Sequence, residues 1–241
     1  MNGLALHEVN SVRGDFSLGP VDLNLDRPIT CIVGPNGAGK STLIGCCTGA
    51  VPHTGRVFWD GREIGRGAVR DWDGVAYVSD TWPKVFDGLT AADYWHLVAA
   101  VRLHRGTRGR LGEWMARAYA LLDSFGAVEI NRPCQYLSFG SRRKVQLIGA
   151  LMCEPSLLFI DEPQNGLDFV ASTTLAAVLR DHARRPGTVT VLASHDLGSV
   201  AAMADAVVAL RNGQVVRRLD GGPPEEVRAA LERVFLADPS G

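Results

Sequence analysis

A glycine-rich segment near the N-terminus has the residue types needed to hold phosphate groups. Its sequence is GPNGAGKST, which follows the apolar run PITCIV and precedes a helix predicted from Lys40 to about Thr48. Glycines let consecutive backbone N–H groups converge on phosphate oxygens, and the start of the helix adds its dipole. Lys40 is expected to reach the β- and γ-phosphates, and the Ser41 hydroxyl is expected to bind Mg²⁺. The predicted phosphate-binding residues are Gly34, Asn36, Gly37, Ala38, Gly39, Lys40, Ser41 and Thr42.

A second apolar run ends in two carboxylates. The sequence LLFID covers Leu157–Asp161, and Glu162 follows it directly. The four apolar residues predict a buried strand whose end places Asp161 beside the phosphate loop as a Mg²⁺ ligand. Glu162 can orient or deprotonate a water molecule for attack on the γ-phosphate. The alternative is a strand followed by an acidic helix cap, but the upstream phosphate loop favours the catalytic interpretation.

Two further segments indicate a function only in combination with the phosphate loop and the two carboxylates. LSFGS, residues 137–141, lies immediately before a predicted helix, where a serine hydroxyl and a glycine amide can bind an anion. The alternative is an ordinary helix N-cap by Ser138 or Ser141. His195 follows the predicted strand TVTVLA and, taken alone, is an ordinary strand-end histidine.

Together these segments resemble the nucleotide-binding domain of ATP-binding cassette (ABC) proteins, over nearly the whole chain. LSFGS resembles the family signature LSGGQ: it keeps Ser138 and Gly140 but has Ser141 where Gln is usual. Gly166-Leu167-Asp168 resembles the D-loop of the family, and Ser194-His195 resembles its switch-region histidine.

The resemblance implies that two ATP molecules bind between two head-to-tail copies of the domain, with Mg²⁺. Lys40 and Glu162 would then act with Ser138 and Gly140 of a second nucleotide-binding subunit, and His195 would contact the γ-phosphate. The resemblance also implies a transmembrane permease on another chain. This chain would lie in the cytoplasm, on the inner face of the cell membrane, through that partner.

Two positions depart from the family pattern. The Gln expected after the strand Gly74–Val78 falls on Asp80, whose carboxylate can still bind Mg²⁺, as in some exporter-type members. The aromatic residue expected to stack on adenine is replaced by Arg13, with Phe16 close by. Either the guanidinium of Arg13 or a nearby ring could stack on the base.

The stretch after Asp80 resembles the permease-docking region of exporter-type cassettes, which favours export as the direction of transport. Its sequence is TWPKVFDGLTAADYWHLVAA. Trp82, Val85 and Phe86 could form an exposed apolar groove for a partner helix. The alternative is that these three side chains belong to the core of a helical subdomain.

Strands that alternate with helices imply an α/β fold with a mainly parallel sheet. We expect a P-loop NTPase core with an N-terminal antiparallel β-subdomain and an inserted α-helical subdomain at about 85–150, within one ABC ATPase domain spanning 1–241. The predicted strands are Pro28–Val33, Gly74–Val78, Ser156–Ile160 and Thr188–Ala193, with an alternating stretch at Val12–Leu25 and hairpins at Arg56–Ile64 and Asp205–Leu219. The other predicted helices are Thr90–His104, Leu111–Phe125, Ser141–Cys153, Asp168–Ala183 and Pro224–Leu236.

Composition narrows the function classes further. The 241 residues include 25 Lys and Arg against 26 Asp and Glu, a balance that argues against a dedicated nucleic-acid surface. No stretch is long and apolar enough to predict a membrane span or a signal peptide. Two alternatives to a transport ATPase remain: an ATP-dependent dimerising switch with weak hydrolysis, and a soluble ABC ATPase without a transport role. Glu162 and His195 favour hydrolysis.

Overall fold

The computed structural model describes residues 3–64, 74–102, 110–126 and 128–236. The N-terminal strands form an antiparallel sheet in the order β2-β1-β4-β5, which confirms the predicted antiparallel β-subdomain. Its strands are β1 (Leu4–Arg13), β2 (Phe16–Leu25), β4 (Thr54–Trp59) and β5 (Arg62–Ile64).

The second sheet has the order β10-β9-β3-β8-β7-β6. Its strands are parallel except for the edge strand β10, which confirms the predicted α/β fold with a mainly parallel sheet. The central strands β3, β7 and β8 are buried along their whole length, as their nearly continuous apolar sequences require. The six strands are β3 (Ile29–Val33), β6 (Val75–Val78), β7 (Leu157–Asp161), β8 (Val189–Ser194), β9 (Ala206–Arg211) and β10 (Gln214–Asp220).

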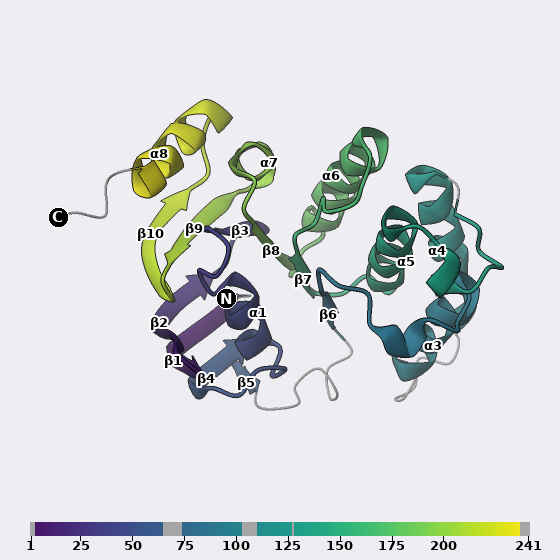
Figure 1. The fold of residues 1–241 in the computed structure, drawn as a ribbon, viewed down its shortest axis with the longest axis horizontal. Helices are drawn as coiled ribbons and strands as arrows, with labels where there is room; N and C mark the ends of the chain where they lie inside the picture. Colours follow the sequence, from purple (N-terminus) through teal and green to yellow (C-terminus); the bar gives the residue numbers. More distant parts are fainter. Residues whose placement is uncertain (1–2, 65–73, 103–109, 127, 237–241) are drawn as a thin grey trace.

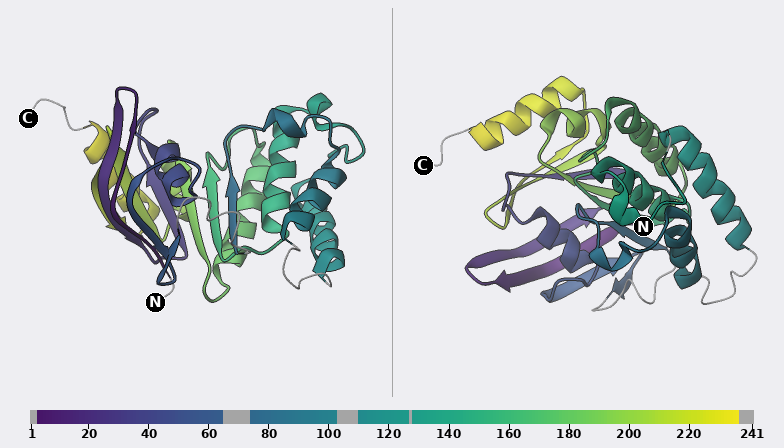
Figure 2. Two further views of the ribbon diagram at one scale, coloured as in Figure 1. Left: turned by 90° about the horizontal axis from the view of Figure 1, so that it is seen from below. Right: turned by 45° about the vertical axis from the view of Figure 1, so that its right-hand side comes forward.

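The helices form two groups around the parallel sheet (Figure 1). Helices α3, α4 and α5 contact one another and lie on the side remote from the antiparallel sheet, whereas α1 lies between the two sheets (Figures 1 and 2). The helices are α1 (Lys40–Cys47), α3 (Ala91–Arg102), α4 (Leu111–Phe125), α5 (Phe139–Leu151), α6 (Phe169–Ala183), α7 (Leu197–Met203) and α8 (Pro224–Leu236), with short 3-10 turns η1 (Lys84–Phe86) and η4 (Cys134–Tyr136). In the described part of the chain, none of these helices has the length and apolar character needed to span a bilayer.

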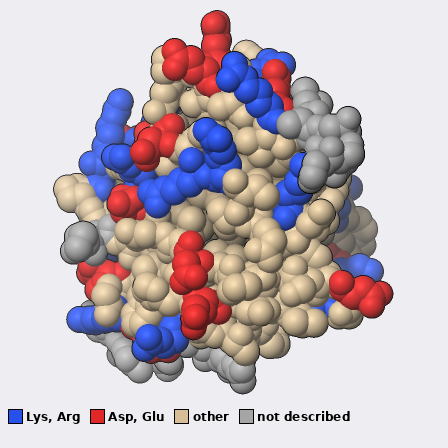
Figure 3. Space-filling view, turned by 90° about the vertical axis from the view of Figure 1, so that its left-hand side faces the viewer, with Lys and Arg blue, Asp and Glu red and all other residues tan. Residues whose placement is uncertain are grey.

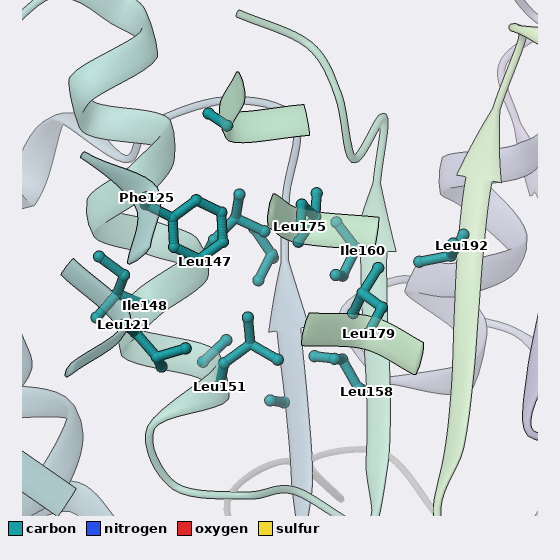
Figure 4. Packing of buried hydrophobic residues seen from close by; sticks show 14 of the residues in the cluster. Leu121, Phe125, Leu147, Ile148, Leu151, Leu158, Ile160, Leu175, Leu179 and Leu192 are labelled. Atoms are coloured by element: carbon teal, nitrogen blue, oxygen red, sulfur yellow. The ribbon is translucent and has the colours of Figure 1, made fainter. Parts of the chain in front are cut away.

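Apolar packing on both faces of the parallel sheet fixes where its strands end. Leu158 and Ile160 of β7 pack against α4, α5 and α6 (Figure 4), whereas Leu157 and Phe159 face α1 and the antiparallel sheet. This alternation follows from the two-residue period of a strand. Because β7 is held from both faces, the residues at its carboxyl end have a fixed position.

Most predicted elements are confirmed within one or two residues. The hairpin turn at Asp60-Gly61 has both residues at positive φ, 47° and 75°, as a type I′ turn requires. The Thr90 hydroxyl and the Asp93 carboxylate bond each other at the start of α3, as the sequence TAAD predicts. The last residues predicted for that helix, 103–104, lie outside the described residues.

Two sequence predictions need correction, and one helix is absent from the predictions. The stretch Val12–Leu25 comprises the last two residues of β1, the turn and all of β2, whereas β1 begins at Leu4. The alternation of β1 is broken by a bulge around Glu8, which has a φ of 49°. Helix α5 begins at Phe139 rather than Ser141, because Ser138 is its N-cap. Helix α7 was not predicted, since its seven residues are too few to show a helical period.

Candidate functional site

The glycine-rich segment forms the loop between β3 and α1. Gly37 and Gly39 have φ values of 81° and 104°, which L side chains rarely adopt. A Cβ atom on Gly39 would lie 2.8 Å from the Cζ atom of Phe16, so the loop also packs closely against β2. The loop borders a cavity of about 420 Å³. Its lining residues are Phe16, Asn36, Gly37, Ala38, Gly39, Lys40, Ser41, Thr42, Asp80, Asp161 and Glu162.

The start of α1 leaves backbone donors directed at this cavity. The N-cap residue of α1 is Gly39, and no side chain in the described part of the chain caps the helix. The first N–H groups of a helix have no partners within it, so an uncapped start is suited to binding an anion. The turn between β9 and β10 supports the loop from behind, because the Gly213 N–H donates to the Ala38 carbonyl at 3.0 Å.

The buried ammonium group of Lys40 lies inside the loop. Its Nζ atom donates to the carbonyls of Gly34 at 2.8 Å and Pro35 at 3.3 Å. The same atom is 3.8 Å from Oε1 of Glu162. The lysine therefore lies between the phosphate loop and the residue predicted to act on water.

Asp161, the last residue of β7, is a buried carboxylate with an oxygen left unpaired. Its Oδ1 atom has no hydrogen-bond partner among the described residues. Burial raises the pKa of Asp161, and the nearby carboxylates of Glu162 and Asp80 add to this, against the opposing effects of the Ser41 hydroxyl and Lys40. A buried, unpaired carboxylate oxygen beside a hydroxyl and a second carboxylate fits a hard divalent cation such as Mg²⁺.

The protein ligands available for such a cation are few. Among the described residues, no group of three or more His, Cys, Asp or Glu side chains could hold a metal ion by itself. Mg²⁺ commonly keeps several waters and takes one or two carboxylates together with substrate phosphates. Ser41, Asp161 and Asp80 are the residues that would hold Mg²⁺ here.

Glu162 connects Lys40 with His195. Its backbone lies in the left-handed region, with a φ of 47°, and its N–H donates to the Ala193 carbonyl of β8 at 2.8 Å. This turns the side chain so that Oε2 lies 3.0 Å from Nδ1 of His195. The His195 side chain is 62% exposed, whereas that of Glu162 is 16% exposed. Residues predicted from three separate motifs therefore meet at one carboxylate.

Asp80 follows β6 and lines the same cavity as the phosphate loop. Its Oδ1 atom accepts a hydrogen bond of 2.7 Å from Nδ2 of Asn165. The sequence did not identify Asn165, because nothing in its neighbourhood predicts that it contacts a residue 85 positions away. The carboxylate stands where the resemblance places a glutamine.

The signature residues do not meet the phosphate loop within one chain. Ser138 is exposed and caps α5, accepting a hydrogen bond from the Ser141 N–H at 3.1 Å. Gly140 lies in the first turn of α5, so close to the Gly166 carbonyl that a side chain would collide with it. The N-cap interpretation is therefore what a single chain shows, and neither residue is among the described residues that line the cavity.

The aromatic residue near the loop is Phe16 rather than a residue at position 13. Arg13 ends β1 with an exposed side chain and is not among the described residues that line the cavity. Phe16 begins β2, is half-buried and lines the cavity. The hairpin turn between these strands decides which of the two side chains faces the loop.

A second, apolar groove of about 780 Å³ lies between β6, α3 and α5. Of the three residues predicted to form such a groove, Phe86 lines it. Trp82 instead packs against Phe86 and Tyr94, and its indole N–H donates to Asp87 at 3.0 Å. Val85 is 80% exposed and is not among the described lining residues.

Comparison with known proteins places this geometry in a family. A family model described as ABC transporter matches residues 19–165 of the chain. The chain belongs to the ABC transporter family. It is an ATP-binding domain of that family, whose ATP-binding subunits are ATPases coupled to transport.

Several known proteins are similar to this ABC transporter domain over most of its length. The zinc import ATP-binding protein ZnuC of Alkalilimnicola ehrlichii is 37% identical over 228 residues, which are 91% of this chain and 77% of that protein. The cobalt import ATP-binding protein CbiO of Rhodobacter capsulatus is 35% identical over 228 residues, which are 90% and 79% of the two chains. A solved ATP binding subunit of an ABC transporter has a TM-score of 0.79 at 25% identity, covering 95% of this chain and 99% of that chain. The ABC ATPase fold therefore extends over nearly the whole chain.

Proposed function

We propose that this chain binds and hydrolyses ATP to drive transport through a separate transmembrane subunit. The observation that carries the proposal is the position of the Glu162 carboxylate, 3.0 Å from His195 and 3.8 Å from Lys40, at the mouth of the phosphate loop. A base held between a phosphate-binding lysine and a histidine is suited to direct a water molecule at a bound γ-phosphate.

Each residue has a distinct role in this mechanism. The backbone N–H groups of the loop and the Lys40 ammonium hold the phosphates, so Lys40 exchanges its bonds to loop carbonyls for phosphate oxygens. Ser41, Asp161 and Asp80 would hold Mg²⁺, which neutralises charge on the phosphate oxygens when bound. Glu162 takes the proton of the attacking water, and His195 fixes the direction of the Glu162 carboxylate.

Phe16 is the residue that we propose stacks on adenine. Its ring lines the cavity and packs against Gly39, whereas Arg13 lies outside the lining. An aromatic ring binds a nucleobase through its face, and such stacking tolerates different bases. Among the two candidates from the sequence, the structure thus favours the ring over the guanidinium.

A second nucleotide-binding subunit, identical or different, completes the proposed site. Ser138 is exposed and Gly140 is partly buried at the start of α5, where we propose that a partner's nucleotide reaches them. Phe169 and Val170, which follow the D-loop, are 85% and 66% exposed, as apolar residues at an interface would be in an isolated subunit.

The transmembrane partner is proposed to dock at the apolar groove lined by Phe86, which keeps the chain at the inner face of the membrane. Export was predicted from the stretch that follows Asp80. The two relatives described above are named as import proteins for zinc and cobalt, so their names favour import and give export no support. Uptake or efflux measured in vesicles containing the whole transporter decides the direction.

Steady-state ATP turnover by the wild-type chain and by Glu162→Gln tests the enzymatic proposal. We expect the variant to bind ATP but to lose turnover by about 100-fold or more, the range that a positioned base contributes. Glu129→Gln, at an exposed position, is the matched control and should turn over ATP as the wild type does. Tight ATP binding by the wild type without turnover, even together with its membrane partner, would favour the dimerising switch instead.

The alternative of an ATPase acting on nucleic acid finds no basic surface on the face that Figure 3 shows. There, Lys and Arg side chains are mixed with Asp and Glu rather than gathered in one patch. Ion pairs such as Arg218 with Asp26, at 3.1 Å, use part of the positive charge within the protein. Salt-sensitive binding of nucleic acid by the purified chain would revive this alternative.

A further inference from the structure

Arg143 is a buried arginine at a position to which no motif assigns a role. It lies in the second turn of α5, and 1% of its surface is exposed. Its guanidinium donates to three backbone carbonyls: those of Ser79 at 2.6 Å, Asp161 at 2.5 Å and Glu162 at 2.8 Å. A fully buried arginine is costly unless it is well paired, so these bonds need an explanation.

The three carbonyls belong to the carboxyl ends of two neighbouring strands. The parallel ladder between β6 and β7 ends at the pair Val78 and Ile160. Arg143 joins the two segments directly beyond that pair, where no ladder hydrogen bonds link β6 with β7. The planar fork of a guanidinium, with several donors in fixed directions, is suited to span two adjacent chain segments.

Both joined segments carry acidic residues of the proposed ATP site. Ser79 precedes Asp80, and the other two acceptors are the backbone carbonyls of Asp161 and Glu162 themselves. Since Arg143 binds main-chain oxygens, the Asp80 carboxylate remains bonded to Asn165 and the Glu162 carboxylate remains beside His195.

The charge of Arg143 also acts on these carboxylates. Burial lowers the pKa of Arg143, while Asp80, Asp161 and Glu162 raise it in that order of strength. The attraction is mutual, so the guanidinium offsets part of the repulsion among three carboxylates held near one cavity. One helical turn later, Gln146 donates to the Thr81 carbonyl at 3.1 Å, so α5 holds the chain on both sides of Asp80.

We propose that Arg143 is a positioning residue of the ATP site, which clamps the ends of β6 and β7 so that Asp80, Asp161 and Glu162 face the bound phosphates as one unit. The inference rests on the proposed ATPase function and adds a structural link between α5 and the acidic residues of the site. Because α5 begins at Ser138, the helix that carries the signature residues also carries the clamp. A shift of α5 against the parallel sheet therefore moves Asp80 and Glu162 with it.

The test compares Arg143→Lys, Arg143→Gln and Arg143→Met with the wild type. We expect kcat to fall about 10- to 100-fold in the Met variant, because a small misplacement of catalytic groups has an effect of this size. The Lys variant should retain the most turnover, because its ammonium group keeps the charge and some carbonyl bonds; the Gln variant should be intermediate. The KM for ATP should change by less than about three-fold, since the phosphate loop is untouched.

Affinity for an ATP analogue without Mg²⁺, and the midpoint of thermal unfolding, separate positioning from a merely structural role. We expect analogue affinity to stay within about three-fold of wild type in every folded variant. Arg180→Gln is the matched control, because Arg180 also donates to a backbone carbonyl, that of Ala202 at 2.6 Å, away from the cavity. It should leave kcat unchanged.

The outcomes are distinct. Wild-type kcat in the folded Lys and Gln variants contradicts the inference and leaves the proposed function standing. A loss of kcat that runs parallel with losses of analogue affinity and thermal stability also contradicts the inference and leaves the proposed function standing. Absence of ATP turnover in the wild type, alone and with its membrane partner, contradicts the proposed function and the inference with it. If the Met variant does not fold, the inference is still tested by the order of kcat values, which should be highest in the wild type, lower in the Lys variant and lowest in the Gln variant.

Discussion

The two ends of α5 carry different arrangements of charge. In its first turns, Arg143 lies near the carboxylates of Asp80, Asp161 and Glu162, and Lys40 adds a second positive charge. Negative charge is in excess here, and the Oδ1 atom of Asp161 is buried without a hydrogen-bond partner among the described residues. A bound cation, which we propose to be Mg²⁺, would offset this excess.

Just beyond the other end of α5, the carboxylate of Glu154 lies among three arginines. It lies 3.0 Å from Arg117, 2.7 Å from Arg185 and 3.9 Å from Arg110. Arg110 also pairs with Glu113 at 3.5 Å, so positive and negative charges pair within the protein at this end. His182 lies nearby, and burial, together with the charges of Arg185 and Arg117, lowers its pKa from 6.5 to about 4.

The difference separates function from stability. Where carboxylates gather at the end of α5 that faces the phosphate loop, burial and repulsion raise the pKa of Asp161, and a bound cation would relieve both. Where arginines gather at the opposite end, the charges pair within the protein, and the paired side chains are partly exposed to solvent. Substitutions at the first end should change ATP chemistry, and substitutions at the second should change stability alone.

The largest effect is expected from Lys40→Ala. The variant should lose ATP affinity or turnover by about 100-fold or more, because it removes the charge-assisted bonds to the phosphates. The variant should remain folded, because Lys40 is not part of the apolar clusters on either face of the parallel sheet. Nucleotide titration and thermal unfolding measure the two quantities. Lys84→Ala, at an exposed lysine, is the control. Unchanged turnover in Lys40→Ala would contradict the assignment of ATP chemistry to the first end of α5.

The second prediction concerns how the unfolding free energy depends on pH through His182, which lies near the carboxyl end of α5. Because the pKa of His182 is lower in the folded chain than the ordinary 6.5, the unfolded chain binds the proton more tightly. Stability is therefore complete above about pH 6.5 and falls as the pH decreases toward 4. Between about pH 7.5 and about pH 5, the wild type should lose about 2 kcal/mol more unfolding free energy than His182→Gln.

Urea unfolding of the wild type and of His182→Gln at the two pH values measures this difference. The other titrating groups are common to both proteins, so their contributions cancel. Equal losses in the two proteins would mean that burial and the neighbouring arginines do not hold His182 neutral.

The sequence predicted the parts of the molecule that depend on local patterns. The phosphate loop, the acidic end of β7 and most helix boundaries follow from spacing within a few residues. The start of α5 was misplaced because Ser138 and Ser141 are both good caps, and only the folded chain shows that Ser138 is used. β1 was missed because the bulge around Glu8 interrupts its alternation.

Contacts between distant segments could not be predicted in the same way. Arg143 lies in the run SRRK, which in a sequence is typical of a solvated helix face, and its burial depends on carbonyls supplied by β6 and β7. Likewise, Arg13 and Phe16 are close in sequence, and only the turn between β1 and β2 decides that the ring faces the cavity. These residues need the whole fold to be identified.

The smallest effect is expected from Glu154→Gln. The carboxylate bonds Arg117 and Arg185, but these side chains are about one-third exposed, so water already weakens the pairs. Partly exposed ion pairs contribute little individually, and we expect the variant to lose about 1 kcal/mol of unfolding free energy. ATP turnover should be unchanged, since Glu154 lies at the end of α5 away from the phosphate loop. Glu113→Gln, at an exposed glutamate 3.5 Å from Arg110, is the control and should lose less. A clear loss of turnover in Glu154→Gln at unchanged stability would show that charge at both ends of α5 serves the ATP site.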